Sequence, residues 1–184
     1  GIAIADAAYE YGATVDLVLG PVNISPVSKG INIINVTTAK SMASECLLLF
    51  PECDIAILSA AVADFTPETT AKRKIKKDGN GFVLKLKPSI DIAFELGKIK
   101  NHLQILTGFA LETNNELENA REKLVRKNFD LIVLNSLSEV GAGFEYSTNR
   151  ITLIDRNNNI DKFEVKSKDE VAKDILDKIV SMIQ

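Results

Sequence analysis

A regular alternation of short apolar runs with longer helix-like segments constrains this chain more than any other feature. Five runs of apolar and β-branched residues have the length of strands, at residues 14–19, 31–36, 54–59, 104–109 and 130–134. Segments with helical spacing at 38–49 and 116–126 lie between them. Strands separated by helices predict right-handed crossovers and a mostly parallel, doubly wound sheet. We therefore expect a Rossmann-like α/β fold.

Two other stretches predict β-hairpin extensions to this sheet. Residues 74–77 and 82–86 flank a glycine-rich turn, and residues 151–154 and 162–165 flank three consecutive asparagines. Three further helices are expected, at 2–11 with a stop at Gly12, at 90–98 with Ser89 as its cap, and at 168–183 after a capping box formed by residues 167 and 170.

The composition fits one globular domain over residues 1–184. Hydrophobic residues make up 46% of the chain and the net charge is −3, which argues against a disordered chain and against a general nucleic-acid binder. We expect no signal peptide and no membrane span, since no apolar run approaches roughly 20 residues. Cys46 and Cys53 form no Cys-x-x-Cys pair, which favours a cytoplasmic protein without a zinc site. The single histidine, His102, lies in an expected surface turn.

Ligands of a doubly wound sheet bind beyond the carboxyl ends of its strands. The segments that follow three of the expected strands are residues 59–67, 109–115 and 135–144. These segments therefore hold the first candidates for a binding site.

The segment Ser59-Ala-Ala-Val-Ala-Asp64 after the third strand allows two interpretations. Small side chains at 59–61 let a ligand approach the backbone, and Asp64 would then hold a ribose hydroxyl or a metal ion. Alternatively, Ala60 and Ala61 pack against a helix and Asp64 caps a turn. The pattern alone favours neither interpretation.

Two groups of basic residues stand out in this acidic chain. Five of the six residues at 72–77 are Lys or Arg, which fits an anion site or a charged strand edge that prevents aggregation. Lys123 and Lys127 lie four residues apart and share one face of the expected helix. This pair either straddles a polyphosphate or is simply solvated.

The familiar phosphate-binding loops are missing from the sequence. It contains neither G-x-x-x-x-G-K-S/T nor G-x-G-x-x-G, and Gly141-Ala-Gly143 lacks the third glycine. This argues against an NAD-linked oxidoreductase.

Several segments, taken in order along the chain, resemble one known family. They are Ser59-Ala-Ala-Val-Ala-Asp64-Phe-Thr-Pro67, Lys74-Ile-Lys-Lys77, Ile90-Asp-Ile92, Gly108-Phe-Ala-Leu-Glu-Thr113, Lys123-Leu-Val-Arg-Lys127, Asp130-Leu-Ile-Val-Leu-Asn135, and Gly141-Ala-Gly-Phe144 followed by Asn149. Together they resemble the phosphopantothenoylcysteine synthetase module of bacterial coenzyme A biosynthesis. In bifunctional proteins that module is the partner of a flavin-dependent decarboxylase module.

The resemblance implies a ligase. CTP would activate the carboxylate of 4′-phosphopantothenate as an acyl-cytidylate and release pyrophosphate. The amine of L-cysteine would then attack the acyl carbon, and CMP would leave. Mg²⁺ is the implied cofactor, because charge that grows during attack at phosphorus needs cations. The resemblance also implies a homodimer in which each active site borrows from the neighbouring subunit.

The resemblance assigns nucleotide contacts to residues spread over the matching segments, namely Leu58, Ser59, Ala60, Asp64, Lys74, Ile90, Asp91, Ile92, Phe109, Lys123 and Lys127. Residues 58–60 would use backbone groups. Asp64 would hold the ribose or the metal-bound triphosphate, and Lys74 would contact the base or a phosphate and act in catalysis. Lys123 and Lys127 would contact the triphosphate. Asn135 would have a weak positional role.

Two departures from the family pattern affect these expectations. The family begins with a strand, a glycine-rich turn and an Asn-x-Ser-Ser-Gly segment, whereas this chain starts at Gly1, within or after that segment. We therefore expect this chain to bind CTP but to make little phosphopantothenoylcysteine. A non-catalytic nucleotide-binding or assembly module is the alternative. The second departure is Pro88-Ser89-Ile90, where the family commonly has Asn-Pro before the aspartate.

Overall fold

The main sheet has five strands with a parallel centre. The computed structural model describes residues 1–71, 73–76, 81–112, 114–136 and 148–183. Its main sheet has the strand order β10-β9-β7-β6-β3. Their bounds are Ile55–Leu58 for β3, Ile105–Glu112 for β6, Leu131–Ser136 for β7, Ile151–Asp155 for β9 and Ile160–Lys162 for β10. A 3-10 turn, η1 (Phe50–Glu52), precedes β3.

The register of the central strands confirms the predicted fold class. β3, β6 and β7 are parallel, with Leu58 opposite Gly108 and Gly108 opposite Ile132. β9 pairs antiparallel with β7, and β10 pairs antiparallel with β9. The hairpin predicted around the three asparagines is therefore present, but its second strand is Ile160–Lys162 and not 162–165. The carboxylate of Asp155 accepts hydrogen bonds from the amides of Asn157 and Asn159 and holds its turn.

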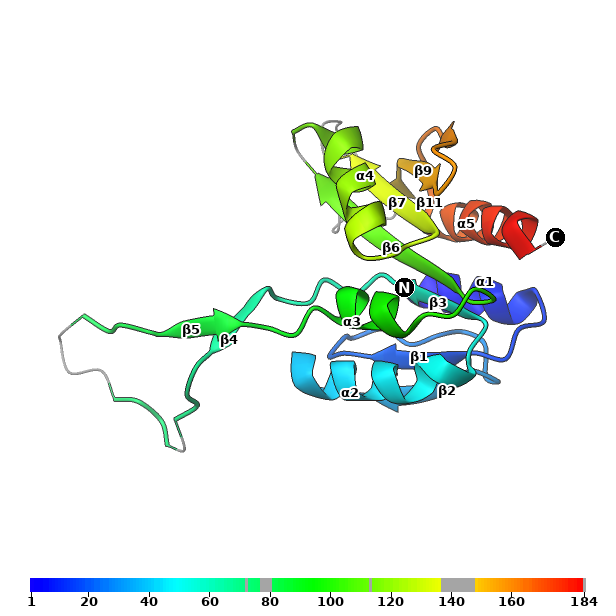
Figure 1. Ribbon diagram of the computed structural model, residues 1–184. Helices are drawn as coiled ribbons and strands as arrows, with labels where there is room; N and C mark the ends of the chain where they lie inside the picture. The colour runs from blue at the N-terminus through cyan, green and yellow to red at the C-terminus, as the bar shows by residue number, and fades with distance from the viewer. Residues whose placement is uncertain (72, 77–80, 113, 137–147, 184) are drawn as a thin grey trace.

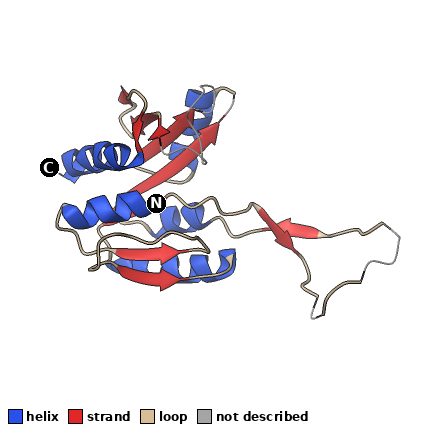
Figure 2. Ribbon diagram, turned by 180° about the vertical axis from the view of Figure 1, so that it is seen from behind, coloured by secondary structure: helices blue, strands red, loops and turns tan. Residues whose placement is uncertain are grey.

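Helices cover both faces of this sheet, as the doubly wound pattern requires (Figure 2). On one face, α1 (Ile2–Glu10) and α5 (Lys168–Ile183) pack together over a core that includes Ile4, Val133 and Ile175. On the other face, α2 (Ala39–Leu49), α3 (Ile92–Ile99) and α4 (Glu116–Arg126) surround a second core. No described helix is long and apolar enough to cross a membrane.

A second parallel pair lies beside the main sheet without being joined to it. β1 (Asp16–Leu19) pairs only with β2 (Asn32–Asn35) among the described strands, and β3 pairs only with β6. In Figure 1, β1 is the strand of its pair nearer to β3. All four residues of β3 are apolar, yet each is only half-buried. The facing edges of β1 and β3 are therefore open along the described chain.

The other predicted hairpin forms an arm that projects from the body, and its strands lie at other residues than predicted. The only strands described in this region are β4 (Phe65–Pro67) and β5 (Leu86–Pro88), which pair antiparallel at the base of the arm. Residues 74–76 and 82–85, where strands were predicted, lie beyond this ladder and are not in strands (Figure 1). Residues 77–80, which include most of the predicted turn at 78–81, lie outside the described residues. An isolated two-stranded ribbon with no layer to pack against is at best marginally stable, which explains the difference.

The helix caps agree with the sequence at two positions and differ at one. Ser167 and Glu170 exchange the hydrogen bonds of a capping box at the start of α5, as predicted. Gly12 follows α1 with φ +87°, which favours glycine. Asp91 caps α3 by accepting from the amide of Phe94, so the prediction of Ser89 was wrong. The Ser89 hydroxyl is buried and bonds to no described residue.

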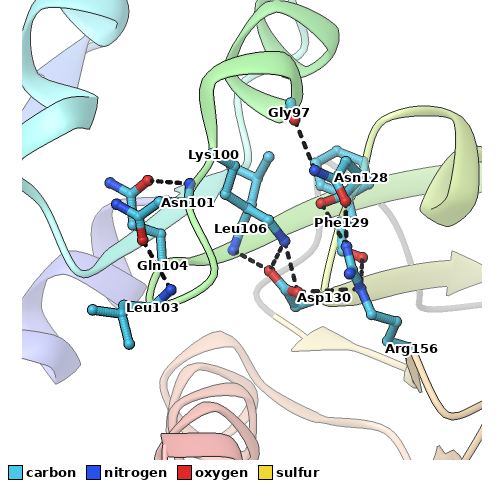
Figure 3. Close-up of polar contacts among 10 residues, drawn as sticks. All are labelled: Gly97, Lys100, Asn101, Leu103, Gln104, Leu106, Asn128, Phe129, Asp130 and Arg156. Atoms are coloured by element: carbon cyan, nitrogen blue, oxygen red, sulfur yellow. Dashed lines mark hydrogen bonds and ion pairs between the residues drawn. The ribbon is translucent and has the colours of Figure 1, made fainter.

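A carboxylate fixes the amino ends of β6 and β7 (Figure 3). Asp130 accepts from the Lys100 ammonium at 2.6 Å and from the amide of Leu106 at 2.8 Å. Arg156 approaches the same carboxylate at 3.3 Å and donates to the carbonyl of Phe129. Burial lowers the pKa of Lys100 despite the opposing effect of Asp130. This cluster lies at the edge of the sheet opposite to the predicted ligand site, so its role is structural.

Gly97 lets α3 pack directly on the turn after α4. A Cβ at Gly97 would overlap the carbonyl oxygen of Lys127, while the side-chain amide of Asn128 donates to the Gly97 carbonyl at 2.7 Å (Figure 3). We expect Gly97→Ala to lower the free energy of unfolding by about 1–2 kcal/mol, because the backbone overlap outweighs the better helix propensity of alanine. Urea unfolding measures the change, with the exposed Lys98→Ala on the same helix as control. A Gly97→Ala protein as stable as the wild type would contradict this packing.

Candidate site at the carboxyl edge of the sheet

The end of β3 carries three of the predicted site residues. Leu58 packs against the second core, so only its backbone faces the edge. Ser59 lies beside Gly1, because a Cβ built on Gly1 would be 2.8 Å from the Ser59 hydroxyl oxygen. Ala60 is exposed, and its carbonyl accepts from the amide of Val62 at 3.1 Å. The first turn of α1 therefore meets the end of β3, where a ligand could contact backbone groups.

The base of the arm brings Asp64 next to the start of α3. The amide of Ser89 donates to the carbonyl of Asp64 at 2.8 Å, and the β4–β5 ladder begins there with Phe65 opposite Pro88. The side chain of Ile90 follows and is exposed. Two segments that are some 25 residues apart in sequence thus converge beside Asp91.

Lys127 is tied to this same corner by an ion pair. Its ammonium lies 3.0 Å from the Asp91 carboxylate, which also caps α3. The backbone of Lys127 packs at Gly97, so the side chain extends along α3 toward the helix N-terminus. The Lys127 side chain is 19% exposed, and its position is therefore largely fixed. An ammonium group at this place can meet an anion that approaches the start of α3.

Lys123 is held in a similar way by the last residue of β6. Its ammonium lies 2.5 Å from one carboxylate oxygen of Glu112, and the Asn119 side-chain amide donates to the other at 3.1 Å. Asn119 also donates to the carbonyl of Asn114 and so ties the turn to α4. Burial raises the pKa of Glu112, but the bonds from Lys123 and Asn119 outweigh it, so the pKa lies below its ordinary value. Glu112 is therefore a stable carboxylate.

The remaining predicted residues divide between the core and the arm. Ile92 is buried in the second core, and Phe109 is half-buried against the first core. Lys74 is exposed on the arm beyond the β4–β5 ladder, and the arm projects away from the body (Figure 1). The structure thus gathers Asp64, Ile90, Asp91 and Lys127 at one corner but leaves Lys74 apart.

Glu112 lies within the Gly108–Thr113 motif, but no role was predicted for it. The available signal was its position, because Glu112 ends a strand whose carboxyl edge was expected to hold the ligand. Its partner Lys123 could not be predicted in the same way, because the contact depends on how α4 packs beside the end of β6. Asn135 at the end of β7 accepts from the Asn149 side chain at 3.0 Å, which gives it a partner on β8 (Thr148–Asn149). β8 pairs with β11 (Lys166–Ser167) next to α5.

The acidic residues described at this edge fit Mg²⁺ that arrives with a nucleotide. Within the described ranges, no three His, Cys, Asp or Glu side chains are grouped to hold a metal ion. Mg²⁺ needs fewer, since it is usually bound through one or two carboxylates together with substrate phosphates. Asp64 is exposed at the base of the arm and offers one such carboxylate.

Comparison with known proteins assigns the family. Residues 1–183 match the sequence model of the DNA/pantothenate metabolism flavoprotein C-terminal domain, or DFP domain. The chain belongs to this family. It is 41% identical over 182 residues to the coenzyme A biosynthesis bifunctional protein CoaBC of Bacillus subtilis (strain 168), covering 99% of this chain and 45% of CoaBC. It is 58% identical over 183 residues to a cysteine/cysteine sulfinic acid decarboxylase from an unknown prokaryotic organism, covering 100% of this chain and 51% of that protein.

Solved structures agree with the fold described above. The crystal structure of the C-terminal domain of CoaBC superposes with a TM-score of 0.83 at 32% identity, covering 100% of this chain and 81% of that one. A Cab2 mutant H337A in complex with phosphopantothenate-cysteine shares the fold, with a TM-score of 0.64 at 17% identity over 84% of this chain and 55% of that one. The chain spans about half the length of the curated relatives it matches.

Proposed function

We propose that this DFP domain is a phosphopantothenate–cysteine ligase unit that uses CTP. The observation that carries the proposal is the match to CoaBC along almost the entire chain, 41% identical over 182 residues. In this reaction a carboxylate oxygen of 4′-phosphopantothenate attacks the α-phosphorus of CTP and pyrophosphate leaves. The amine of L-cysteine then attacks the acyl carbon, an amide forms, and CMP and a proton are released.

The site supports the first half of this reaction. Lys123 and Lys127 supply two ordered ammonium groups, which stabilise the negative charge of a triphosphate and of the departing pyrophosphate. Backbone groups at 58–60 and the exposed Ile90 offer a surface for the base. Asp64 would hold Mg²⁺ with the phosphates, and the metal would neutralise charge during attack at phosphorus.

The position of Lys74 favours a homodimer with shared active sites. Lys74 lies on an arm that leaves its own body, and the arm exposes apolar side chains that include Phe82, Val83 and Leu84. Such a surface on a single chain favours association with a second copy. We propose that the arm crosses to the partner and delivers Lys74 to the nucleotide bound there.

A strand supplied from upstream of Gly1 would complete the sheet. The edges of β1 and β3 are open among the described strands; β3 is apolar and half-buried, and so is β1 after its exposed first residue, Asp16. A parallel strand between them would lead into α1 and end near Ser59. The flavin decarboxylase module, if fused, would precede it.

The relative with 58% identity supports a second candidate. Its name describes a decarboxylase of cysteine or cysteine sulfinic acid, and this chain covers only 51% of it. Under this alternative the decarboxylation belongs to the other half of such a protein, and this domain serves as a nucleotide-binding or assembly module. It would then bind CTP without ever supporting amide formation.

Nucleotide titration tests the proposed site. We expect CTP with Mg²⁺ to bind more tightly than ATP. Lys123→Ala and Lys127→Ala should each weaken CTP binding by about tenfold to a hundredfold, since a charged contact contributes about 1.5–3 kcal/mol. The same variants should change CMP binding less, with the exposed Lys98→Ala as control. Equal losses for CTP and CMP would contradict the triphosphate assignment, and a preference for ATP would contradict the choice of nucleotide.

A further inference from the structure

The Glu112 carboxylate occupies the place beside Lys123 where the proposed function expects a phosphate of the nucleotide. Its carboxylate is in contact with the Lys123 ammonium at 2.5 Å and receives Asn119 at 3.1 Å. The Glu112 side chain is 15% exposed and the Lys123 side chain 34% exposed. The pair borders a surface depression of about 760 Å³ that is also lined by Arg121, Glu122 and Arg126. The negative charge is therefore fixed at the mouth of an open space.

The two hydrogen bonds fix the carboxylate but do not use up the ammonium group. Lys123 has three N–H donors, and one of them bonds to Glu112 among the described residues. A phosphate oxygen bound to another donor would lie within roughly 5 Å of the Glu112 carboxylate, a distance at which like charges repel appreciably in partly buried surroundings. Glu112 thus orders Lys123 and at the same time weakens its attraction for anions.

We propose that Glu112 is a counter-charge that keeps Lys123 ordered and neutralised at rest and promotes release of pyrophosphate. A triphosphate with its metal carries enough charge to compete with Glu112 for the ammonium. Once the bond from the α-phosphorus to the oxygen that bridges it to the β-phosphorus is broken, the carboxylate regains Lys123 and the pyrophosphate departs. This inference rests on the proposed function, because it requires Lys123 to contact the phosphates.

The test removes only the charge of Glu112 and measures the binding affinity for ligands of increasing charge. Glu112→Gln keeps the volume and an oxygen that accepts from Lys123 or Asn119. We expect it to tighten the binding of CTP and of inorganic pyrophosphate by about threefold to tenfold. CMP should tighten less, and uncharged cytidine should bind as before. The matched control is Glu122→Gln, which removes the same charge from the same depression at a side chain that lies on α4 itself.

Each outcome of these titrations decides the matter. Tightening that follows ligand charge supports the proposal, whereas weaker CTP binding would make Glu112 a purely structural support for Lys123 and overturn it. Unchanged binding of every ligand would also overturn it. A wild-type chain that binds no CTP would instead remove the proposed function, so the two failures are distinguishable.

A second measurement uses the unmodified protein, so it tests the proposal even if the Glu112→Gln variant does not fold. Carbon-13 labelling reports the chemical shift of the Glu112 carboxylate. Saturating pyrophosphate should shift this signal, because at that concentration it competes with the carboxylate for Lys123, and cytidine should leave it in place. A signal that pyrophosphate does not move would contradict the exchange.

Discussion

Lys74→Ala is expected to reduce product formation by the full-length protein to a few per cent of wild type, and a second inactive variant should restore part of it. The reason is that Lys74 lies on an arm that leaves its own body, whereas Lys123 lies on α4 within the body. If the arm serves the partner's site, a heterodimer of Lys74→Ala and Lys123→Ala contains one site with both lysines. Random pairing of equal amounts makes half of the dimers mixed, so about one quarter of all sites should recover.

Co-expression of the two variants with different affinity tags, followed by a product assay, measures this recovery. Light scattering on the wild type should first give the mass of a dimer. The control pairs the exposed Lys98→Ala with Lys123→Ala. This mixture should give no more product than wild type mixed with Lys123→Ala at the same ratio. A monomeric mass, or no recovery on mixing, would contradict delivery of Lys74 in trans.

The second large effect concerns the gap between β1 and β3. A strand supplied from upstream of Gly1 would bury the apolar edges of both strands and join the two sheets. The amides of the first turn of α1 would then face the phosphates together with the turn that precedes the helix, an arrangement that favours anions. We expect the 184-residue chain to bind CTP but to form little product, and the chain extended upstream to melt at a higher temperature and to turn over.

Local sequence patterns predicted the elements whose stability is local. The α4 helix matches its predicted bounds, because its alternation of charged and apolar residues suits a half-exposed helix wherever it packs. The capping box before α5 was readable for the same reason, since Ser167 and Glu170 satisfy each other within one turn. The central strands followed from their apolar runs.

The elements that were missed depend on partners distant in sequence. Charged and apolar residues at 74–86 have the pattern of a hairpin, but the ladder forms farther toward the base, where Phe65 meets Pro88. Both Ser89 and Asp91 can cap a helix, and the path of the chain out of β5 selects Asp91. Their spacing placed Lys123 and Lys127 on one helix face and the family resemblance assigned them to the nucleotide, whereas their carboxylate partners come from β6 and from the start of α3.

Product formation from 4′-phosphopantothenate, L-cysteine and CTP, measured on both the 184-residue chain and the chain extended upstream, tests the central claim most directly. Pyrophosphate release followed in parallel separates activation of the carboxylate from amide formation. The ligase proposal predicts phosphopantothenoylcysteine from the extended chain with CTP and little from residues 1–184. Full turnover by residues 1–184 would contradict the need for the upstream strand, and an extended chain that binds CTP yet forms neither pyrophosphate nor product would contradict the ligase itself.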